Sequence, residues 1–119
     1  MLEATSQLPI DVFMMVPSCV PATKYDESLQ PITAAMIKPY LKHTRILGLG
    51  ELMDYIGTIN KDKAILDKIA VTKKAGKIID GHAPSLIGKD LIKYASFGIN
   101  SDHECTNLNE ALQKLKLGM

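Results

Sequence analysis

The sequence predicts an α/β fold of parallel βα units with about four strands. Three short apolar runs, at residues 46–50, 78–81 and 98–102, are separated by segments with helical character. A longer and nearly continuous apolar run at residues 10–16 is typical of a strand buried on both faces of a parallel sheet. In such folds the chemistry collects at the carboxyl ends of the strands, so the residues that end these runs are the first candidates for a site.

Strands and helical segments are expected to alternate along the chain. The expected strands are residues 10–16, 45–50, 77–81 and 99–102. The expected helical segments cover about residues 2–7, 32–43, 60–75, 88–97 and 108–117, and a loop covers about residues 52–59. This spacing is ordinary for βα units.

Prolines and glycines mark many of the expected ends. Pro9 stops the first helical segment, and Pro39 is expected to break or kink the second one. Two further prolines make residues 17–23 a rigid loop, because each fixes φ and removes a backbone donor. Gly76 and Gly98 follow the third and fourth helical segments, where glycine commonly ends a helix.

Caps and apolar stripes support two of the helices. Asn60 is expected to cap the helix at residues 60–75 and Thr106 the last helix, because short polar side chains accept hydrogen bonds from free N–H groups. The stripe of the earlier helix contains Ala64, Ile65, Ile69 and Ala70. The stripe of the last helix contains Leu108, Ala111, Leu112 and Leu115.

Length and composition indicate one modest domain over residues 1–119. The net charge of +1 gives no field that would attract nucleic acid or an anionic membrane. No apolar run approaches the ~20 residues of a membrane span, and the N-terminus lacks the features of a signal peptide. Cys19 and Cys105 are expected to be reduced thiols in a cytoplasmic protein.

Glu51, His82 and His103 end three successive apolar runs. Each alone fits an ordinary role: an exposed charge, a loop histidine bonded to backbone, or a polar turn before a helix. One carboxylate and two imidazoles on one rim of a sheet, however, form a metal site that activates water. Their joint placement favours a shared metal site over three separate ordinary roles. His43 lies at the opposite rim and is expected to be structural.

Further polar residues lie close to these candidates. Asp102 and Glu104 flank His103, and either can orient its ring or take a proton. Ser18 and Cys19 are possible nucleophiles, but no sequence feature places a base beside them. The zinc nucleobase deaminase signature H-x-E…P-C-x-x-C is absent from the sequence, as are GxGxxG, GxxxxGK[ST] and GxSxG motifs.

Four segments resemble the consecutive strand-end motifs of bacterial adenine deaminases, which belong to the metal-dependent amidohydrolase superfamily. These segments are PSCVPAT at 17–23, GLGE at 48–51, DGHAP at 80–84 and SDHEC at 101–105. The resemblance covers essentially the whole chain. It implies a distorted (β/α)8 barrel, of which this chain would form the middle half, strands three to six.

The resemblance also implies an activity. A binuclear site of iron, manganese or zinc would activate hydroxide to attack C6 of adenine, giving hypoxanthine and ammonia. Glu51 matches the glutamate that bridges the metals, and His82 and His103 match metal-binding histidines. Glu104 is a candidate proton shuttle or substrate contact, and Ser18 and Cys19 are candidate substrate-binding residues.

The sequence also departs from that family. The H-x-H pair of its first strand is absent, and strands one, two, seven and eight have no counterpart here. We therefore expect an incomplete and inactive fragment, which self-associates to cover unpaired sheet edges and an apolar face. Two alternatives remain: a working deaminase whose other ligands come from a partner, and a small unrelated α/β binding or interaction module without catalysis.

Overall fold

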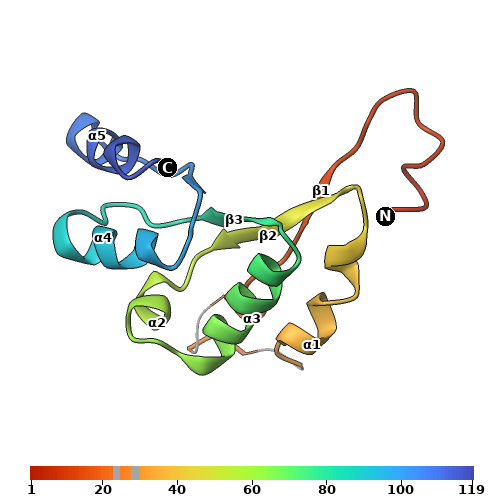
Figure 1. Cartoon of the computed structure of the whole chain (residues 1–119), viewed down its shortest axis with the longest axis horizontal. Coiled ribbons are helices and arrows are strands. Elements are labelled where there is room, and N and C mark those ends of the chain that lie inside the picture. Colours follow the sequence, from red (N-terminus) through yellow and green to blue (C-terminus); the bar gives the residue numbers. More distant parts are fainter. Residues whose placement is uncertain (23–24, 28–29) are drawn as a thin grey trace.

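The computed structural model describes residues 1–22, 25–27 and 30–119. Within these ranges the chain forms a parallel sheet of four strands, in the order β1-β2-β3-β4 (Figure 1). The strands are β1 (Met14–Val16), β2 (Ile46–Leu52), β3 (Ile78–Gly81) and β4 (Ser101–Asp102). Sequence neighbours are also sheet neighbours, as expected for consecutive βα units, so the predicted fold class is confirmed.

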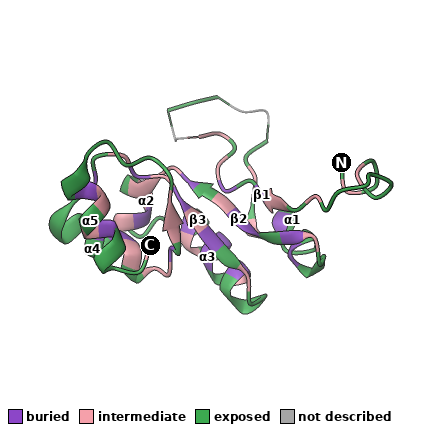
Figure 2. Cartoon of the chain, turned by 90° about the horizontal axis from the view of Figure 1, so that it is seen from above, coloured by how far each residue is buried: buried purple, intermediate pink, exposed green. Residues whose placement is uncertain are grey.

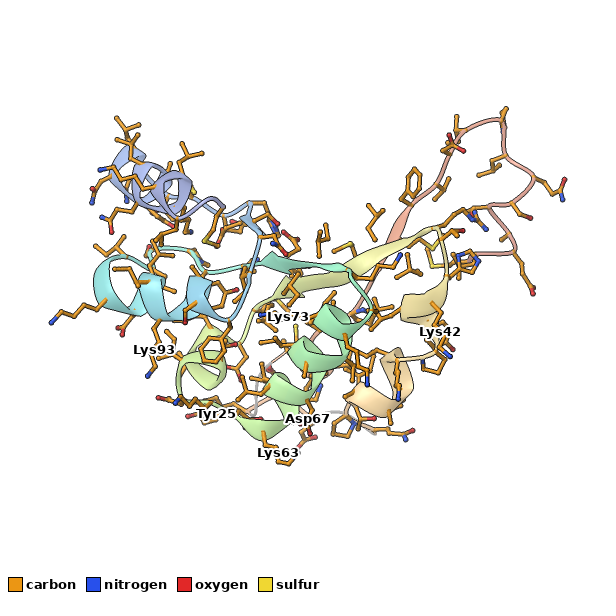
Figure 3. The ribbon with its side chains drawn as sticks, in the orientation of Figure 1. Tyr25, Lys42, Lys63, Asp67, Lys73 and Lys93 are labelled. Atoms are coloured by element: carbon orange, nitrogen blue, oxygen red, sulfur yellow. The ribbon has the colours of Figure 1, made fainter. Side chains whose placement is uncertain are left out.

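Helices connect the strands. They are α1 (Ala34–Ile37), the 3-10 helix η1 (Tyr40–Lys42), α2 (Tyr55–Ile59), α3 (Lys63–Lys74), α4 (Gly88–Ser96) and α5 (Leu108–Lys116). α3 packs on β2 and β3 and also contacts α1 (Figure 1). Its outer side is charged, with an ion pair of 2.6 Å between Lys63 and Asp67 (Figure 3). None of the helices in the described ranges is long and apolar enough to cross a membrane.

The apolar core lies between the sheet and its helices (Figure 2). Leu49 and Ile79 are fully buried at its centre, and Ile65 and Ile69 contribute from α3. Other apolar side chains on or beside the strands remain exposed, namely Phe13, Leu47 and Ile78. The prediction that residues 10–16 are buried on both faces is therefore wrong, because no described segment covers these side chains.

Several expected element boundaries are also wrong. Residues 2–7 form turns rather than a helix, and only Met14–Val16 of the expected first strand is paired. The expected loop at 52–59 contains α2, because Asp54 caps it by accepting a hydrogen bond of 2.7 Å from Gly57 N–H. The loop expected at 17–23 ends in a residue that lies outside the described ranges.

The caps of two helices differ from the prediction. Asn60 ends α2, and Asp62 caps α3 instead. Asn107, not Thr106, caps α5. In both cases the true cap is the polar side chain nearest the first helical turn. Two predictions at helix ends are confirmed: the helix expected at 32–43 is broken at Pro39, and Gly76 follows α3 with a φ of +67°.

Candidate metal centre

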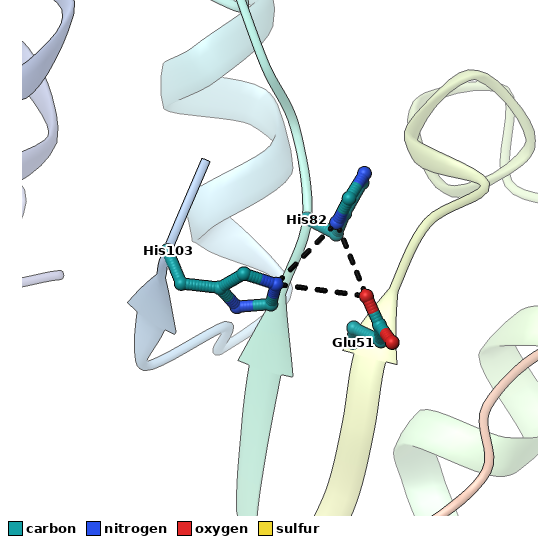
Figure 4. A group of neighbouring side chains, drawn as sticks. All are labelled: Glu51, His82 and His103. Carbon is teal, nitrogen blue, oxygen red and sulfur yellow. Dashed lines mark hydrogen bonds and ion pairs between the residues drawn. The ribbon is translucent and has the colours of Figure 1, made fainter. Parts of the chain in front are cut away.

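Glu51 owes its orientation to an irregularity in β2. Leu49 pairs with Ile79, but three positions later Leu52 pairs with Gly81, which is only two positions along β3. The extra residue is a β-bulge. It allows Leu49 and Leu52 both to be buried, although their odd spacing would place them on opposite faces of a regular strand. Glu51 is left exposed and turned toward the end of β3 (Figure 4).

Three donor atoms at neighbouring strand ends form a compact triangle (Figure 4). Glu51 Oε2 lies 3.2 Å from His82 Nδ1 and 3.5 Å from His103 Nε2. The two imidazole nitrogens are 3.5 Å apart, and the rings meet edge to face. The structure thus brings the three predicted side chains together, whereas an unrelated binding module would let them point apart. Their role as metal ligands stays a prediction.

The dimensions of the triangle fit one cation. With metal–ligand bonds of about 2.1 Å, two ligands of a tetrahedral site lie roughly 3.4 Å apart. The three observed separations lie between 3.2 and 3.5 Å. Zinc, manganese and iron all accept imidazole and carboxylate ligands. The side chains of Glu51 and His103 are about half exposed (51% and 46%), so the triangle is open to solvent and to further ligands.

Asp80 is a site residue that the sequence reasoning missed. Its Oδ2 lies 3.4 Å from His103 Nδ1, and its Oδ1 accepts a hydrogen bond of 2.5 Å from the Ser101 hydroxyl. A carboxylate on Nδ1 keeps the proton there and leaves Nε2 free to face the triangle. The signal was present in the sequence, since Asp80 and His82 are two positions apart and therefore share a face of the strand.

Tyr94 ties together the two strand ends that carry Glu51 and His82. This side chain of α4 is fully buried. Its hydroxyl donates to Leu52 O at 2.8 Å and accepts from His82 N–H at 3.2 Å. Burial raises the pKa of Tyr94, which keeps the hydroxyl protonated as a donor. Sequence reasoning missed Tyr94, because a tyrosine in an amphipathic helix gives no sign of this bridging contact.

Gly81 allows β3 and β4 to approach closely beside this bridge. A Cβ atom on Gly81 would lie 2.5 Å from Ser101 O and 3.1 Å from the Tyr94 hydroxyl. Any larger residue would force β4 away from β3. Since His82 and His103 follow these two strands, the glycine helps to bring their rings within reach of each other.

Ser18 and Cys19 meet the backbone of Glu51 from the neighbouring strand end. The buried Ser18 hydroxyl donates to Glu51 O at 2.6 Å, and the Cys19 thiol contacts the same oxygen at 3.6 Å. A cavity of about 780 Å³ adjoins both residues and also the α3 residue Lys68. None of the three triangle residues lines this cavity, so it does not have the position of a purine pocket.

The remaining candidates, Asp102, Glu104 and His43, differ in their surroundings. The Asp102 carboxylate bonds to backbone groups instead of the His103 ring: it accepts from Ala83 N–H at 2.9 Å and from Glu104 N–H at 2.8 Å. Glu104 is exposed next to His103. His43 lies at the amino-terminal end of β2, as expected, where its Nδ1 accepts a hydrogen bond of 3.1 Å from Arg45 N–H.

Comparison with known proteins agrees with this arrangement. Residues 1–118 match the Amidohydrolase family, so the chain belongs to the amidohydrolases. Members of that family fold as (β/α)8 barrels, and the four parallel strands of the described ranges are consistent with a part of one.

Curated sequences similar to this chain include adenine deaminases. "Adenine deaminase 2" of Carboxydothermus hydrogenoformans is 50% identical over all 119 residues, which cover 20% of that protein. "Adenine deaminase" of Methanocaldococcus jannaschii is 51% identical over 110 residues, again 20% of its length. "Adenine deaminase" of Nitratidesulfovibrio vulgaris is 44% identical over 119 residues, 21% of its length. The chain therefore spans about a fifth of the relatives that it matches.

Proposed function

We propose that this chain is the metal-binding segment of an adenine deaminase-like hydrolase, which converts adenine and water to hypoxanthine and ammonia. The observation that carries the proposal is the triangle of Glu51, His82 and His103, whose separations of 3.2 to 3.5 Å suit one cation. The substrate in this proposal, adenine, is inferred from the names of the relatives.

In this proposal the triangle holds a divalent manganese, iron or zinc ion. Glu51 would hold the ions of a binuclear site together with the two imidazoles. A bound ion of this kind supplies Lewis-acid activation of water. The chain's own residues orient the ligands: Asp80 holds the proton on His103 Nδ1, and Tyr94 fixes the backbone of His82.

The other predicted residues keep smaller roles in the proposal. Glu104 is exposed beside His103 and would move a proton or contact the purine. Cys19 is partly exposed next to Glu51 and would contact substrate. Because Ser18 is buried and bonded to Glu51 O, we expect it to act on substrate mainly by positioning Glu51.

Metal titration and turnover test the proposal separately. The purified chain should bind Zn²⁺ or Mn²⁺, and Glu51→Gln should weaken binding at least tenfold by removing the only charged ligand of the triangle. We expect little ammonia release from adenine, because three donors on an open rim leave the ion underligated and unenclosed. A chain that takes up neither ion would contradict the proposal, and rapid ammonia release would contradict the expected inactivity.

We also propose that the chain self-associates in the reducing cytoplasm. Phe13, Leu47 and Ile78 are between 42% and 55% exposed, and both described cysteines are free thiols. Sedimentation should therefore give a mass above 13.0 kDa. A monomer that binds no hydrophobic dye would contradict self-association.

A further inference from the structure

α5 turns its charged side inward and its apolar side outward. The buried residues of α5 are Glu110 and Lys114, whereas Leu108, Leu112 and Leu115 are 46% to 75% exposed. This is the reverse of an ordinary amphipathic helix. Apolar packing therefore does not explain how α5 is held against the strand ends that carry the candidate metal ligands.

Lys114 supplies the first part of the attachment. Its ammonium group contacts Glu110 Oε1 at 2.6 Å, Ala83 O at 2.9 Å and Asp102 Oδ2 at 3.1 Å. These three oxygens match the three donors of an ammonium group. The side chains of all three charged residues are at most 3% exposed, so little water competes for the contacts.

Glu110 supplies the second part. One carboxylate oxygen accepts from Ser85 N–H at 2.9 Å, and the other accepts from Thr106 N–H at 2.9 Å and from the Thr106 hydroxyl at 2.6 Å. Burial alone would raise the pKa of Glu110, but the hydrogen bonds from Lys114 and Thr106 outweigh it and lower that pKa to about 2. Glu110 is therefore held as a carboxylate.

The groups held by this network flank both imidazoles. Ala83 follows His82, and Asp102 and Glu104 are the two neighbours of His103. β4 has only two residues and cannot by itself fix the segment that follows it. The network also links the two segments directly, because the Asp102 carboxylate accepts from Ala83 N–H.

From these contacts we infer that Lys114, Glu110 and Asp102 are positioning residues that set the separation of the His82 and His103 rings. The inference rests on the proposed metal site for its functional meaning, but the ring geometry itself can be measured without metal. The network acts through the backbone that follows His82 and through the backbone on both sides of His103.

Glu110→Gln is the main test, with Thr72→Val as the matched control. The amide nitrogen of glutamine would face either Lys114 or the Thr106 N–H, so one end of the network must open. Thr72 is also buried and hydrogen-bonded, but it bonds within α3 to Lys68 O. Thr106→Val is a milder second variant, since Thr106 is exposed and the change leaves the Thr106 N–H bond to Glu110 in place. It removes the hydroxyl that contacts Glu110, Ser85 and Asn107.

Two measurements test the positioning role, both on the full chain and under conditions where circular dichroism shows that the chain is folded. The first is Zn²⁺ affinity, by competition with a chromophoric chelator. We expect Glu110→Gln to weaken it at least tenfold and Thr106→Val about threefold. The second is the NMR cross-peak between the His82 and His103 ring protons in the metal-free chain, which should be lost or reduced in the same variants. Thr72→Val should change neither.

The outcomes separate the two proposals. If Glu110→Gln and Thr106→Val keep both the cross-peak and the affinity, the positioning role is overturned. If Glu110→Gln does not fold, Thr106→Val decides by the same two measurements. If the unaltered chain takes up no Zn²⁺ while Glu110→Gln loses the cross-peak, the proposed metal function fails and the positioning role is supported.

Discussion

The α3 side and the α5 side of this molecule are held by different interactions. α3 contributes Ile65 and Ile69 to an apolar core, whereas α5 is attached through buried Glu110 and Lys114 with its leucines outside. Apolar packing is non-directional and tolerates small shifts, whereas a charged network fixes particular atoms at particular distances. The comparison suggests that the core side holds the fold and the network side sets the geometry of the candidate site.

Removing one member of the network should have the largest effect on stability. In Lys114→Met the carboxylates of Glu110 and Asp102 stay buried without their cation, and we expect a loss of about 3–5 kcal/mol in the free energy of unfolding. Denaturant unfolding measures the loss. The double variant Glu110→Gln, Lys114→Met should lose less than the sum of the single variants, and strict additivity would contradict a coupled network.

Removing core volume on the other side should cost nearly as much without affecting the site. Ile69→Ala leaves a cavity beneath the sheet, and we expect a loss of about 2–5 kcal/mol in the free energy of unfolding. The folded fraction should keep the Zn²⁺ affinity of the unaltered chain, because α3 packs chiefly on β2, β3, α1 and α2, away from the network on α5. A tenfold weaker affinity in folded Ile69→Ala would remove the contrast between the two sides.

Acid should weaken the network side selectively. The pKa of Glu110 is about 2 in the folded chain and 4.5 for the ordinary group. Its contribution to the free energy of unfolding is therefore present above pH 4.5 and is lost as the pH falls toward 2. The stability difference between the unaltered chain and Glu110→Gln, measured by denaturant at pH 5 and pH 3, should shrink at the lower pH. An unchanged difference would argue against an ionised Glu110.

The same contrast explains how far the sequence could be interpreted. The apolar runs predicted the strands and their order because burial of β-branched and leucine side chains is a local signal. The convergence of Glu51, His82 and His103 followed from the topology alone, since parallel strands end at one edge. The features that the sequence did not predict depend on tertiary contacts. Nothing local distinguishes the inward-facing Glu110 from an ordinary surface glutamate.

The errors have the same origin. The stripe of Leu108, Ala111, Leu112 and Leu115 supported a helix at α5 but did not reveal which side faces inward, because the ions of the network determine which side is buried. The bulge that turns Glu51 also depends on pairing between strands and has no clear mark in the sequence. The sequence predicts a loop in place of α2 because a five-residue helix containing Gly57 has weak propensity and depends on its Asp54 cap.

Tyr94→Phe tests a contact between the two sides, and we expect it to lower the free energy of unfolding by less than the substitutions above. It removes one oxygen and leaves Leu52 O and His82 N–H without their partner, so we expect a loss of about 1–3 kcal/mol. Thermal unfolding measures the loss, and hydrogen exchange of the His82 amide should become faster. Tyr40→Phe, at an exposed position, is the control. Equal stability of Tyr94→Phe and the unaltered chain would show that the bridge contributes nothing.

The smallest effect on stability, and the most specific effect on the site, is expected from Asp80→Asn. The substitution keeps the shape of the side chain but removes the charge that holds the proton on His103 Nδ1. Zn²⁺ affinity should fall about tenfold, or about 1.4 kcal/mol, while unfolding stays within about 0.5 kcal/mol because Asp80 is partly exposed. Asp67→Asn makes the same change on the outer side of α3 and should alter neither quantity. If Asp80→Asn binds Zn²⁺ as tightly as Asp67→Asn, the ring of His103 is oriented by its backbone alone, and the charged network attached to α5 is then sufficient to place it.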